Sequence, residues 1–379
     1  MKILYIASVR IPSEKASGLA IVRQCVAFAD NGQDVTLLIP RRQNPIETDL
    51  FSYYGEKPVI KIVYYPSLGI FNWGLFGFIL TRFFDQMVTF LFLIRNRREV
   101  DILYARDQWM LLFPILFGFS KKTTLEIHTK HTDFFTKYVI QHANKVVAIS
   151  SGLKYFYESF THRTGVSVEA SGVELEQFKK LPGRIEAKMS LGLPLDVTIF
   201  SYVGRYSTMG ESKGVEEIIK AFGKIYKESI NTHLYIVGLD TREIEPVTKL
   251  MKESSLPVGV YTLSELDQTK FALYLEASDV LLMNYPQTEH YALYMSPTKL
   301  FAYLAAGKPI VTTDLPSIRE IGIMSGVVYV EKDIDTVSSY SEAMRYTLNN
   351  LKTLSSKALE NKSVALNFSW KERAKRLLL

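Results

Sequence analysis

Residues 197–222 read VTIFSYVGRYSTMGESKGVEEIIKAF, and this stretch predicts a strand, a glycine-containing loop and a helix in that order. The same alternation recurs on both sides of it. The other predicted strands are KILYIAS, DVTLLIP, DILYAR, TTLEIH and KVVAIS in the first half, and THLYIVG, VGVYTL, DVLLMNY, KPIVTTD and VVYV in the second. Strands that alternate with helices predict an α/β protein whose parallel sheets are covered by helices on both faces.

The alternation weakens between Val173 and Pro194, where Pro, Gly and charged residues gather. We therefore predict an N-terminal domain over residues 1–180, a linker over 181–194 and a C-terminal domain over 195–358. Two doubly wound domains in series have a cleft between them as the default ligand site.

Composition narrows the functional class. The chain has 379 residues, of which 47% are hydrophobic and 22% charged, as in a compact soluble protein. Its single cysteine, Cys25, excludes an intramolecular disulfide framework and a multi-thiolate metal cage, and it fits a reducing compartment. The N-terminus shows no secretory signal, so we expect a cytoplasmic protein.

The positive charge is one-sided. Residues 1–184 contain 23 Lys and Arg against 16 Asp and Glu, whereas the remainder contains 22 against 23. A one-sided excess beside an aromatic-rich segment fits an anionic membrane surface at least as well as a nucleic acid. Nothing else in the chain resembles a nucleic-acid-binding module, so we expect no nucleic-acid partner.

The most hydrophobic stretch is SLGIFNWGLFGFILTRFFDQMVTFLFLIRNRR, residues 67–98. Polar residues interrupt it before about 18 apolar residues have passed, which argues against a transmembrane helix. Its apolar and polar residues follow two faces of one helix, the apolar set being Phe76, Ile79, Leu80, Phe83, Met87, Phe90 and Ile94, and the polar set Arg82, Asp85, Gln86 and Thr89. Two interpretations of segment 71–94 stay open: a core helix with a solvated basic tail, or a helix that lies on a membrane with Arg95, Arg97 and Arg98 at its end.

Two short motifs predict anion-binding sites. In the first, Ser296 is a favoured N-cap and Pro297 a favoured first helical residue, followed by Thr298 and Lys299. A helix that begins here points free backbone N–H groups outward, and its dipole disfavours the cation of Lys299 until an anion binds. The alternative is a plain capped helix with a solvated lysine.

The second motif is the loop after VTIFSYVG, which carries Arg205 and Lys213 ahead of the predicted helix 215–229. Ligands of α/β sheets bind at the carboxyl ends of strands. The fork of Arg205 and the point charge of Lys213 could together neutralise a diphosphate without a metal. The alternative is an exposed basic turn.

Three further positions are weaker candidates. Gly18 lies between a loop and a helix, where a substrate could approach its backbone or the chain could simply turn. His128 ends the strand TTLEIH, where it could hydrogen-bond a sugar hydroxyl or serve a structural role. The triplet Asp333-Ile334-Asp335 has the spelling of a metal–nucleotide motif, but its place ahead of the helical stretch 337–350 indicates a helix N-cap.

Six segments, in this order, resemble the retaining, nucleotide-sugar-dependent glycosyltransferases of family 4. They are Gly18, VVAIS ahead of Gly152, GVELEQF, VGR with Lys213-Gly214, SPTKLFAYLAAGKPIVTTDLPSIRE, and FSW around Trp370. The resemblance covers nearly the whole chain. It implies the GT-B fold, with two Rossmann-like domains, an inter-domain cleft, and a C-terminal helix within 359–379 that crosses back to the N-terminal domain.

The resemblance also implies roles for the candidate residues. In such enzymes the residues matching Arg205 and Lys213 contact the donor diphosphate, the segment matching Ser296, Pro297, Thr298 and Lys299 lines the donor site, and the residue matching His128 lies near the donor sugar. The implied protein is a hexosyltransferase of polysaccharide biosynthesis. It would transfer a sugar from a UDP- or GDP-sugar to a saccharide or lipid-linked acceptor, with retention and without a metal or other cofactor, and could associate peripherally with a membrane.

The chain departs from this family at its Glu-x7-Glu motif, because Tyr294 and Ala302 stand where the two glutamates are expected. The missing second carboxylate leaves ribose hydroxyls unpaired, which costs about 1 to 3 kcal/mol of binding unless Glu289 substitutes. This departure motivates a second hypothesis, a non-catalytic GT-B protein that binds a partner or a nucleotide. A third is a nucleotide-sugar epimerase, which would form product without any acceptor.

Overall fold

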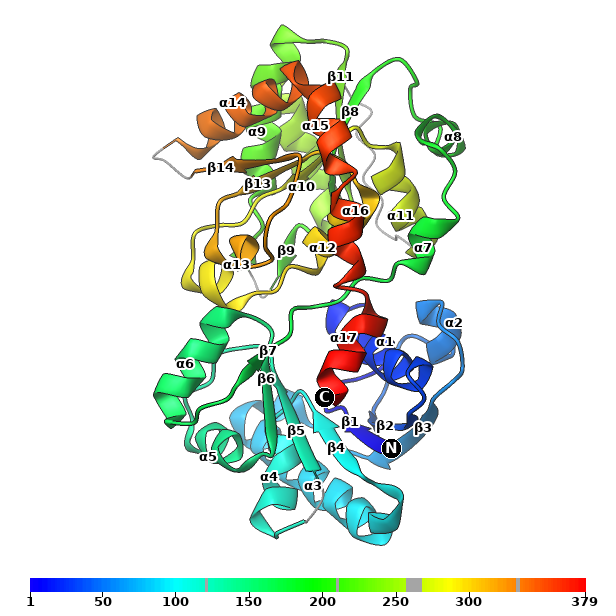
Figure 1. Ribbon diagram of the computed structural model, residues 1–379, viewed down its shortest axis with the longest axis vertical. Helices are drawn as coiled ribbons and strands as arrows, with labels where there is room; N and C mark the ends of the chain where they lie inside the picture. Colours follow the sequence, from blue (N-terminus) through cyan, green and yellow to red (C-terminus); the bar gives the residue numbers. More distant parts are fainter. Residues whose placement is uncertain (120–121, 209–210, 257–267, 332–334) are drawn as a thin grey trace. The chain divides into compact units, whose positions relative to one another are not determined.

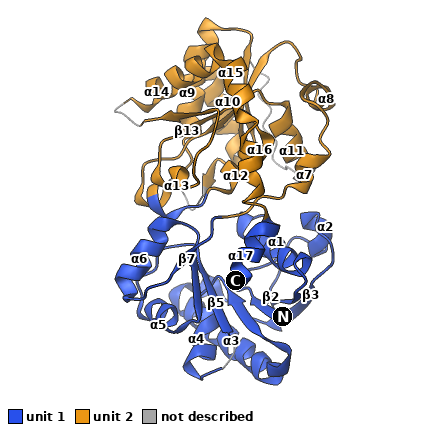
Figure 2. Cartoon of the chain, in the orientation of Figure 1, with its two compact units in different colours: residues 1–170, 293–296, 370–379 blue, residues 171–292, 297–369 orange. Residues whose placement is uncertain are grey.

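The computed structural model describes residues 1–119, 122–208, 211–256, 268–331 and 335–379, and the chain divides into two compact units (Figures 1 and 2). Unit 1 comprises residues 1–170, 293–296 and 370–379, and unit 2 comprises 171–292 and 297–369. The predicted linker 181–194 lies in unit 2, and the last helix of the chain lies in unit 1.

Unit 1 is built on a seven-stranded parallel sheet with the order β3-β2-β1-β4-β5-β6-β7. The strands are β1 (Lys2–Ile6), β2 (Asp34–Arg41), β3 (Lys61–Pro66), β4 (Ile102–Ala105), β5 (Lys122–Ile127), β6 (Lys145–Ala148) and β7 (Ser167–Val168). Its helices are α1 (Ala16–Asp30), α2 (Leu50–Tyr54), α3 (Gly74–Arg95), α4 (Trp109–Leu116), α5 (Phe134–His142), α6 (Ser151–Thr161) and α17 (Trp370–Leu378), with short 3-10 turns η1 (Phe71–Trp73) and η2 (Arg97–Glu99).

The alternation of side chains along β1 shows why this sheet is covered on both faces. Leu4 and Ile6 enter one hydrophobic cluster, whereas Ile3 and Tyr5 enter a second cluster on the opposite face. Both clusters are buried, so β1 reads as a continuous hydrophobic run, as central strands of parallel sheets do.

Unit 2 is built on a five-stranded parallel sheet with the order β11-β8-β12-β13-β14. The strands are β8 (Thr198–Val203), β11 (Thr232–Val237), β12 (Val280–Met283), β13 (Ile310–Thr313) and β14 (Val327–Val330), and a separate two-stranded ribbon pairs β9 (Ser207–Thr208) with β10 (Glu211–Ser212). The predicted strand VGVYTL falls within residues 257–267, outside the described residues.

The helices of unit 2 cover its sheet as the sequence predicts. They are α7 (Glu176–Lys179), α8 (Arg184–Ser190), α9 (Val215–Glu228), α10 (Thr241–Glu253), α11 (Gln268–Ala277), α12 (Thr298–Ala306), α13 (Pro316–Arg319), α14 (Thr336–Asn349), α15 (Leu351–Ala358) and α16 (Asn361–Leu366), and a π-helical turn η3 (His290–Tyr294) precedes α12. The predicted doubly wound parallel sheets are therefore confirmed in both units.

Helix α3 contradicts the interpretation of segment 71–94 as an ordinary core helix. The amphipathic helix forms as predicted, but its polar residues Thr81, Asp85, Gln86 and Thr89 are buried, and most of its apolar residues are exposed. Residues 71–95 are long and apolar enough to cross a membrane by length and composition alone. Periodicity separates the two faces of a helix, but it does not say which face turns inward.

Candidate functional site

The first set of candidate residues gathers in unit 2, at the C-terminal end of β8. The strand ends at Val203, and Gly204 and Arg205 follow it directly. The loop then forms the β9–β10 ribbon and reaches Lys213 immediately before Gly214, the N-cap of α9. This is the strand–loop–helix order that residues 197–222 predict.

Gly214 is required at its position. Its φ is +67°, and an added Cβ would come within 2.0 Å of the Asn284 side-chain nitrogen. Asn284 follows β12 and donates from Nδ2 to the Gly214 carbonyl at 2.8 Å, while Thr313 Oγ1 donates to Asn284 Oδ1 at 2.8 Å. A chain of buried hydrogen bonds from the neighbouring strand ends thus fixes the loop that carries Lys213.

The start of α12 differs by one residue from the prediction. The helix begins at Thr298, its N-cap is Pro297 and not Ser296, and no side chain caps it. Pro297 takes φ −75° and ψ 98°, an extended conformation outside the helix, so the predicted capping role of Ser296 is wrong. Lys299 is accordingly the second helical residue.

Lys299 is buried, which contradicts the alternative of a solvated lysine. Its exposed fraction is 9%, and within the described part of the chain its Nζ atom has no hydrogen-bond partner. The ammonium lies 3.4 Å from the centroid of the Tyr202 ring. Gly204 makes room for it, since an added Cβ would stand 2.7 Å from Lys299 Cε. Cation–π attraction compensates only part of the desolvation of this charge.

The charges around Lys299 are of the same sign. Burial lowers the pKa of Lys299 well below its usual value, and the charge of Lys213 lowers it further. Burial and the charge of Arg205, opposed by Glu243, together lower the pKa of Lys213 to about 8. Glu243 already accepts hydrogen bonds from Asp240 N at 2.8 Å and Ser207 Oγ at 3.0 Å. The end of β8 therefore concentrates positive charge that a polyanion would stabilise.

These pKa values predict how anion binding depends on pH. Because the pKa values of Lys213 and Lys299 are both lowered in the free protein, we expect the affinity for a nucleoside diphosphate to fall as the pH rises, with an inflection near pH 8 where Lys213 loses its proton. Calorimetric titration with UDP over this range measures the effect. In Lys213→Arg the inflection should vanish because a guanidinium stays charged, and an unchanged profile would contradict the assignment.

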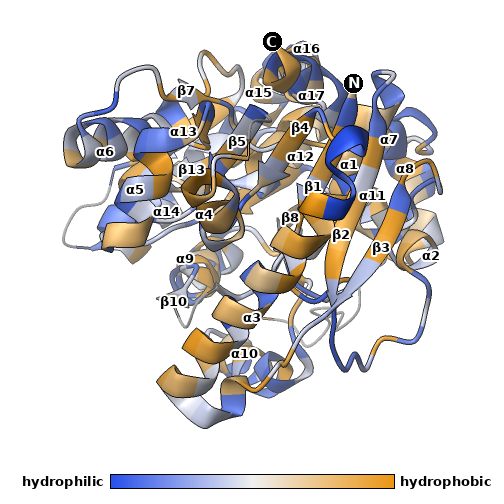
Figure 3. Cartoon of the chain, turned by 90° about the horizontal axis from the view of Figure 1, so that it is seen from below, coloured by the Kyte–Doolittle hydropathy of each residue, from blue (hydrophilic) through white to orange (hydrophobic). Residues whose placement is uncertain are grey.

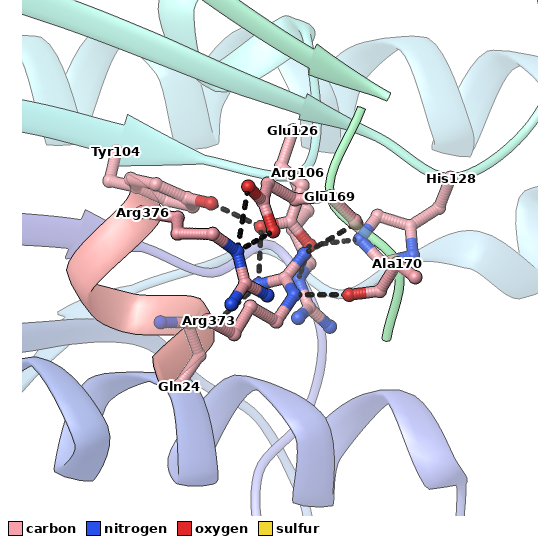
Figure 4. A network of polar contacts seen from close by, with 9 residues as sticks. All are labelled: Gln24, Tyr104, Arg106, Glu126, His128, Glu169, Ala170, Arg373 and Arg376. Carbon is pink, nitrogen blue, oxygen red and sulfur yellow. Dashed lines mark hydrogen bonds and ion pairs between the residues drawn. The ribbon is translucent and has the colours of Figure 1, made fainter. Parts of the chain in front are cut away.

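The second set of candidates lies in unit 1, where His128 follows β5. Its Nε2 lies 2.6 Å from Oε1 of Glu126, which is fully buried (Figure 4). The same Glu126 oxygen is 3.2 Å from Arg106 Nε and 3.0 Å from Arg373 Nη2, and Tyr104 bonds to the other oxygen. Arg373 comes from α17, where it also donates from Nε to the Ala170 carbonyl at 2.7 Å and bonds to Gln24.

This network fixes the protonation of His128. The cations around Glu126 hold the pKa of its carboxyl well below its usual value, so Glu126 is an acceptor and His128 Nε2 carries the hydrogen. Burial and the charge of Arg106 lower the pKa of His128 to about 4. His128 is therefore neutral at physiological pH, with Nδ1 as a hydrogen-bond acceptor. Because the unfolded chain protonates this residue near pH 6.5, unit 1 loses stability as the pH falls from 6.5 to 4.

The remaining candidates are placed as follows. Gly18 lies in the first turn of α1, where an added Cβ would stand 2.4 Å from the hydroxyl of Tyr54, so close packing explains this glycine. Glu289 is exposed and precedes η3. Asp335 is the predicted N-cap, since its Oδ1 accepts from Ser338 N at 3.0 Å, and Asp333 lies outside the described residues.

Sequence reasoning missed several residues of these two sets. Tyr202 and Asn284 sit at strand ends, and a search for polar or aromatic residues at such positions would have found them. Glu126 stands two residues before His128, so the two side chains share one side of the chain, which is a readable signal. Arg373 gave no signal, because it lies more than 240 residues away from Glu126 in the sequence.

A part of the chain that lies mostly in unit 2 matches a known protein family. Residues 198–350 match the model of the family described as glycosyl transferases group 1. We call these residues the group 1 domain. The group 1 domain includes Arg205, Lys213 and Lys299, so the predicted resemblance is confirmed at this level. The assignment to family 4 stays a prediction.

A curated relative of the chain is the putative teichuronic acid biosynthesis glycosyltransferase TuaH of Bacillus subtilis strain 168. The two are 35% identical over 91 residues, which is 24% of this chain and 22% of that protein. The similarity thus spans about a fifth of the relative.

Solved structures resemble the whole chain and not only the group 1 domain. A glycosyltransferase from Rickettsia africae matches with a TM-score of 0.75 at 16% identity, covering 99% of this chain and 96% of that one. The Anabaena protein HepE in complex with UDP and glucose matches with a TM-score of 0.69 at 15% identity, covering 100% and 98%. These likenesses, with the two parallel sheets, confirm the predicted GT-B fold.

Proposed function

We propose that this protein transfers a sugar from a nucleotide-diphosphate sugar to a saccharide or lipid-linked acceptor. The observation that carries the proposal is the buried side chain of Lys299, whose Nζ has no hydrogen-bond partner among the described residues and which lies beside Lys213 and Arg205 inside the group 1 domain. A diphosphate supplies the negative charge that this cluster lacks. The bound UDP and glucose of HepE, a protein of the same fold, support a nucleotide sugar as the donor, which we propose is a UDP- or GDP-sugar.

The cation cluster, by which we mean Arg205, Lys213 and Lys299, acts on the leaving group. Cleavage of the anomeric bond builds positive charge on the sugar and negative charge on the diphosphate. A bound diphosphate raises the lowered pKa values of Lys213 and Lys299, so both bind it as cations together with Arg205 and stabilise that negative charge. We propose that the step needs no metal. We propose that the departing phosphate itself accepts the acceptor proton, so that the sugar is transferred with retention of its anomeric configuration.

His128 is proposed to position a sugar. Its neutral ring offers Nδ1 as an acceptor, because Nε2 is bound to Glu126. A sugar hydroxyl can donate to this nitrogen, and 30% of the His128 side chain is exposed. Ser296, Pro297, Thr298, Glu289 and Gly18 complete the proposed set of donor-site residues, as the family resemblance implies.

The anomeric configuration of the product tests whether the sugar is transferred with retention. NMR spectra of the product formed from an α-linked UDP- or GDP-sugar should show a new α-anomeric linkage, and the reaction should proceed in the presence of EDTA. A β-linked product would contradict retention, and activity that returns only with added magnesium would contradict the metal-free step. Product formed from donor alone would favour the epimerase hypothesis.

An alanine at position 302, where the family has a glutamate, favours a second function, which is nucleotide or partner binding without catalysis. It lies three residues after Lys299 on α12, so both side chains project on the same side of the helix, and it is buried. A carboxylate at this position would lie where the family binds the ribose.

We therefore expect Ala302→Glu to bind UDP about tenfold more tightly than the wild type, because ribose hydroxyls gain a charged acceptor, which binds them more strongly than a neutral one. Ala302→Gln is the matched control, since it has the same size and no charge. Titration calorimetry measures both. If Ala302→Glu binds no better than Ala302→Gln, the site is repurposed and the non-catalytic hypothesis gains support.

The setting of the reaction is also a proposal. A hexosyltransferase of polysaccharide biosynthesis would act in the cytoplasm on acceptors that a membrane can carry. The basic first half of the chain, with 23 Lys and Arg against 16 Asp and Glu in residues 1–184, supports such a setting.

A further inference from the structure

Helix α3 presents to solvent the face that a soluble protein normally buries (Figure 3). Eight large apolar side chains of this helix are between 36% and 76% exposed, and we call them the α3 face: Leu75, Phe76, Ile79, Leu80, Phe83, Met87, Leu91 and Ile94. Trp73, just ahead of the helix, is 61% exposed. A contiguous apolar stripe of this length on a surface marks an interaction site.

Ion pairs lock α3 in this orientation. Asp85 is fully buried and pairs with Arg42 at 2.8 Å, and Arg82 pairs with Asp107 at 2.6 Å. Turning the helix over would break both pairs and expose Thr81 and Thr89 in exchange for apolar surface. The same polar residues exclude a transmembrane path, since they would then enter the hydrocarbon core. The α3 face must therefore be covered by something that approaches unit 1 from outside.

The apolar surface continues onto the end of α4. Phe117 is 65% exposed and stacks on Phe90 of α3 with ring centroids 5.1 Å apart, and its neighbour Leu116 is 50% exposed. Aromatic rings are thus present both ahead of α3, at Trp73, and beside its second half. Aromatic and long aliphatic side chains of this kind insert at the boundary between headgroups and acyl chains.

Positive charge accompanies the apolar stripe. Arg95, Arg97 and Arg98 are exposed at the C-terminal end of α3, and no ion pair engages any of them among the described residues. The nearest acid in the sequence, Glu99, pairs with Lys2 at 2.5 Å. The only acid on α3 is the buried Asp85. The exposed side of the helix is therefore apolar and cationic, with no negative charge.

We propose that the α3 face docks on an anionic lipid bilayer, with α3 lying in the plane of the interface and the three arginines at the phosphate level. Charge complementarity selects this occupant over a second copy of the chain. A second copy would offer the same apolar and cationic surface, with no carboxylate to meet the arginines. Lipid phosphates supply that charge, and the acyl boundary takes the apolar side chains.

Sedimentation with vesicles tests the proposal independently of any glycosyl transfer. The wild type should bind phosphatidylcholine vesicles that contain phosphatidylglycerol about tenfold more tightly than vesicles of phosphatidylcholine alone, and added salt should weaken the binding. The double variant Phe76→Ser, Phe83→Ser should lose at least about tenfold in affinity. The matched control is Ile230→Ser, Ile323→Ser, which removes two apolar residues of unit 2 that are more exposed than Phe76 and Phe83, and it should bind as the wild type does.

A second measurement locates the contact. Lipids brominated on their acyl chains should quench the fluorescence of the wild type on binding, and Trp73→Phe should lose most of that quenching. UDP affinity should be the same in all these variants, which separates this proposal from the proposed function. Equal vesicle binding by the Phe76→Ser, Phe83→Ser variant would overturn the proposal. So would a wild-type dimer that this variant dissociates while neither protein binds vesicles, because the occupant would then be a second copy.

Discussion

Replacing Lys213 by alanine is expected to slow the release of nucleoside diphosphate from the sugar donor by about 100- to 1,000-fold. Lys213 lies at the end of β8 beside Arg205 and near Lys299, and its ammonium would meet the charge that develops on the leaving group. A group that acts mainly in the transition state lowers kcat more than it raises KM when removed. The measurement is steady-state kinetics of diphosphate release at saturating donor.

Lys249→Ala is the matched control for this experiment. Lys249 lies on α10 in the same unit with a side chain 78% exposed, so its loss should leave the rate unchanged. Both variants should keep the wild-type circular dichroism spectrum and melting temperature. A Lys213→Ala enzyme that is folded and turns over at a near-normal rate would refute the role of the cation cluster.

The second large effect is on stability. Arg373→Ala is expected to lower the free energy of unfolding of unit 1 by about 3 to 5 kcal/mol, because it leaves the buried carboxylate of Glu126 with one cation fewer and frees the carbonyl of Ala170. Arg376→Ala is the control on the same helix. Arg376 pairs with Glu169 at 2.9 Å, and 38% of the Arg376 side chain is exposed. Because exposed ion pairs contribute little, we expect Arg376→Ala to lower the free energy of unfolding by about 1 kcal/mol or less.

Tryptophan fluorescence isolates this effect. The three tryptophans, Trp73, Trp109 and Trp370, all lie in unit 1, so urea unfolding followed by their emission reports on that unit and not on unit 2. Equal midpoints for the Arg373→Ala and Arg376→Ala proteins would show that the buried network contributes no more than a surface pair.

The sequence predicts the sheets well because parallel strands buried on both faces read as apolar runs between helical stretches. It also places Arg205 and Lys213 correctly at a strand end, since loop position follows from strand position. The predicted start of α12 is wrong by one residue, because the fixed φ of proline fits both an extended residue ahead of a helix and the first helical turn. Strand VGVYTL lies beyond what the structure describes.

The burial of Lys299 and the orientation of α3 could not be predicted, for related reasons. Lys299 is buried because Gly204 and Tyr202, nearly 100 residues earlier, leave a space for it. Helix α3 turns its polar face inward because Arg42 and Asp107, distant in the sequence, pair with that face. Periodicity carries no information about such partners. The same holds for Glu126, whose partner Arg373 is supplied by the last helix.

The central claim is that the cation cluster of unit 2 binds the diphosphate of a nucleotide sugar. Isothermal titration of the wild type with UDP, GDP and ADP and their sugar conjugates, first in EDTA and then with magnesium, tests it without any acceptor. We predict binding at micromolar concentrations of one nucleotide in EDTA, and a large loss of that binding in Lys299→Met, which removes the buried ammonium and keeps the length of the side chain. Failure of every nucleotide to bind, with and without magnesium, would contradict the claim.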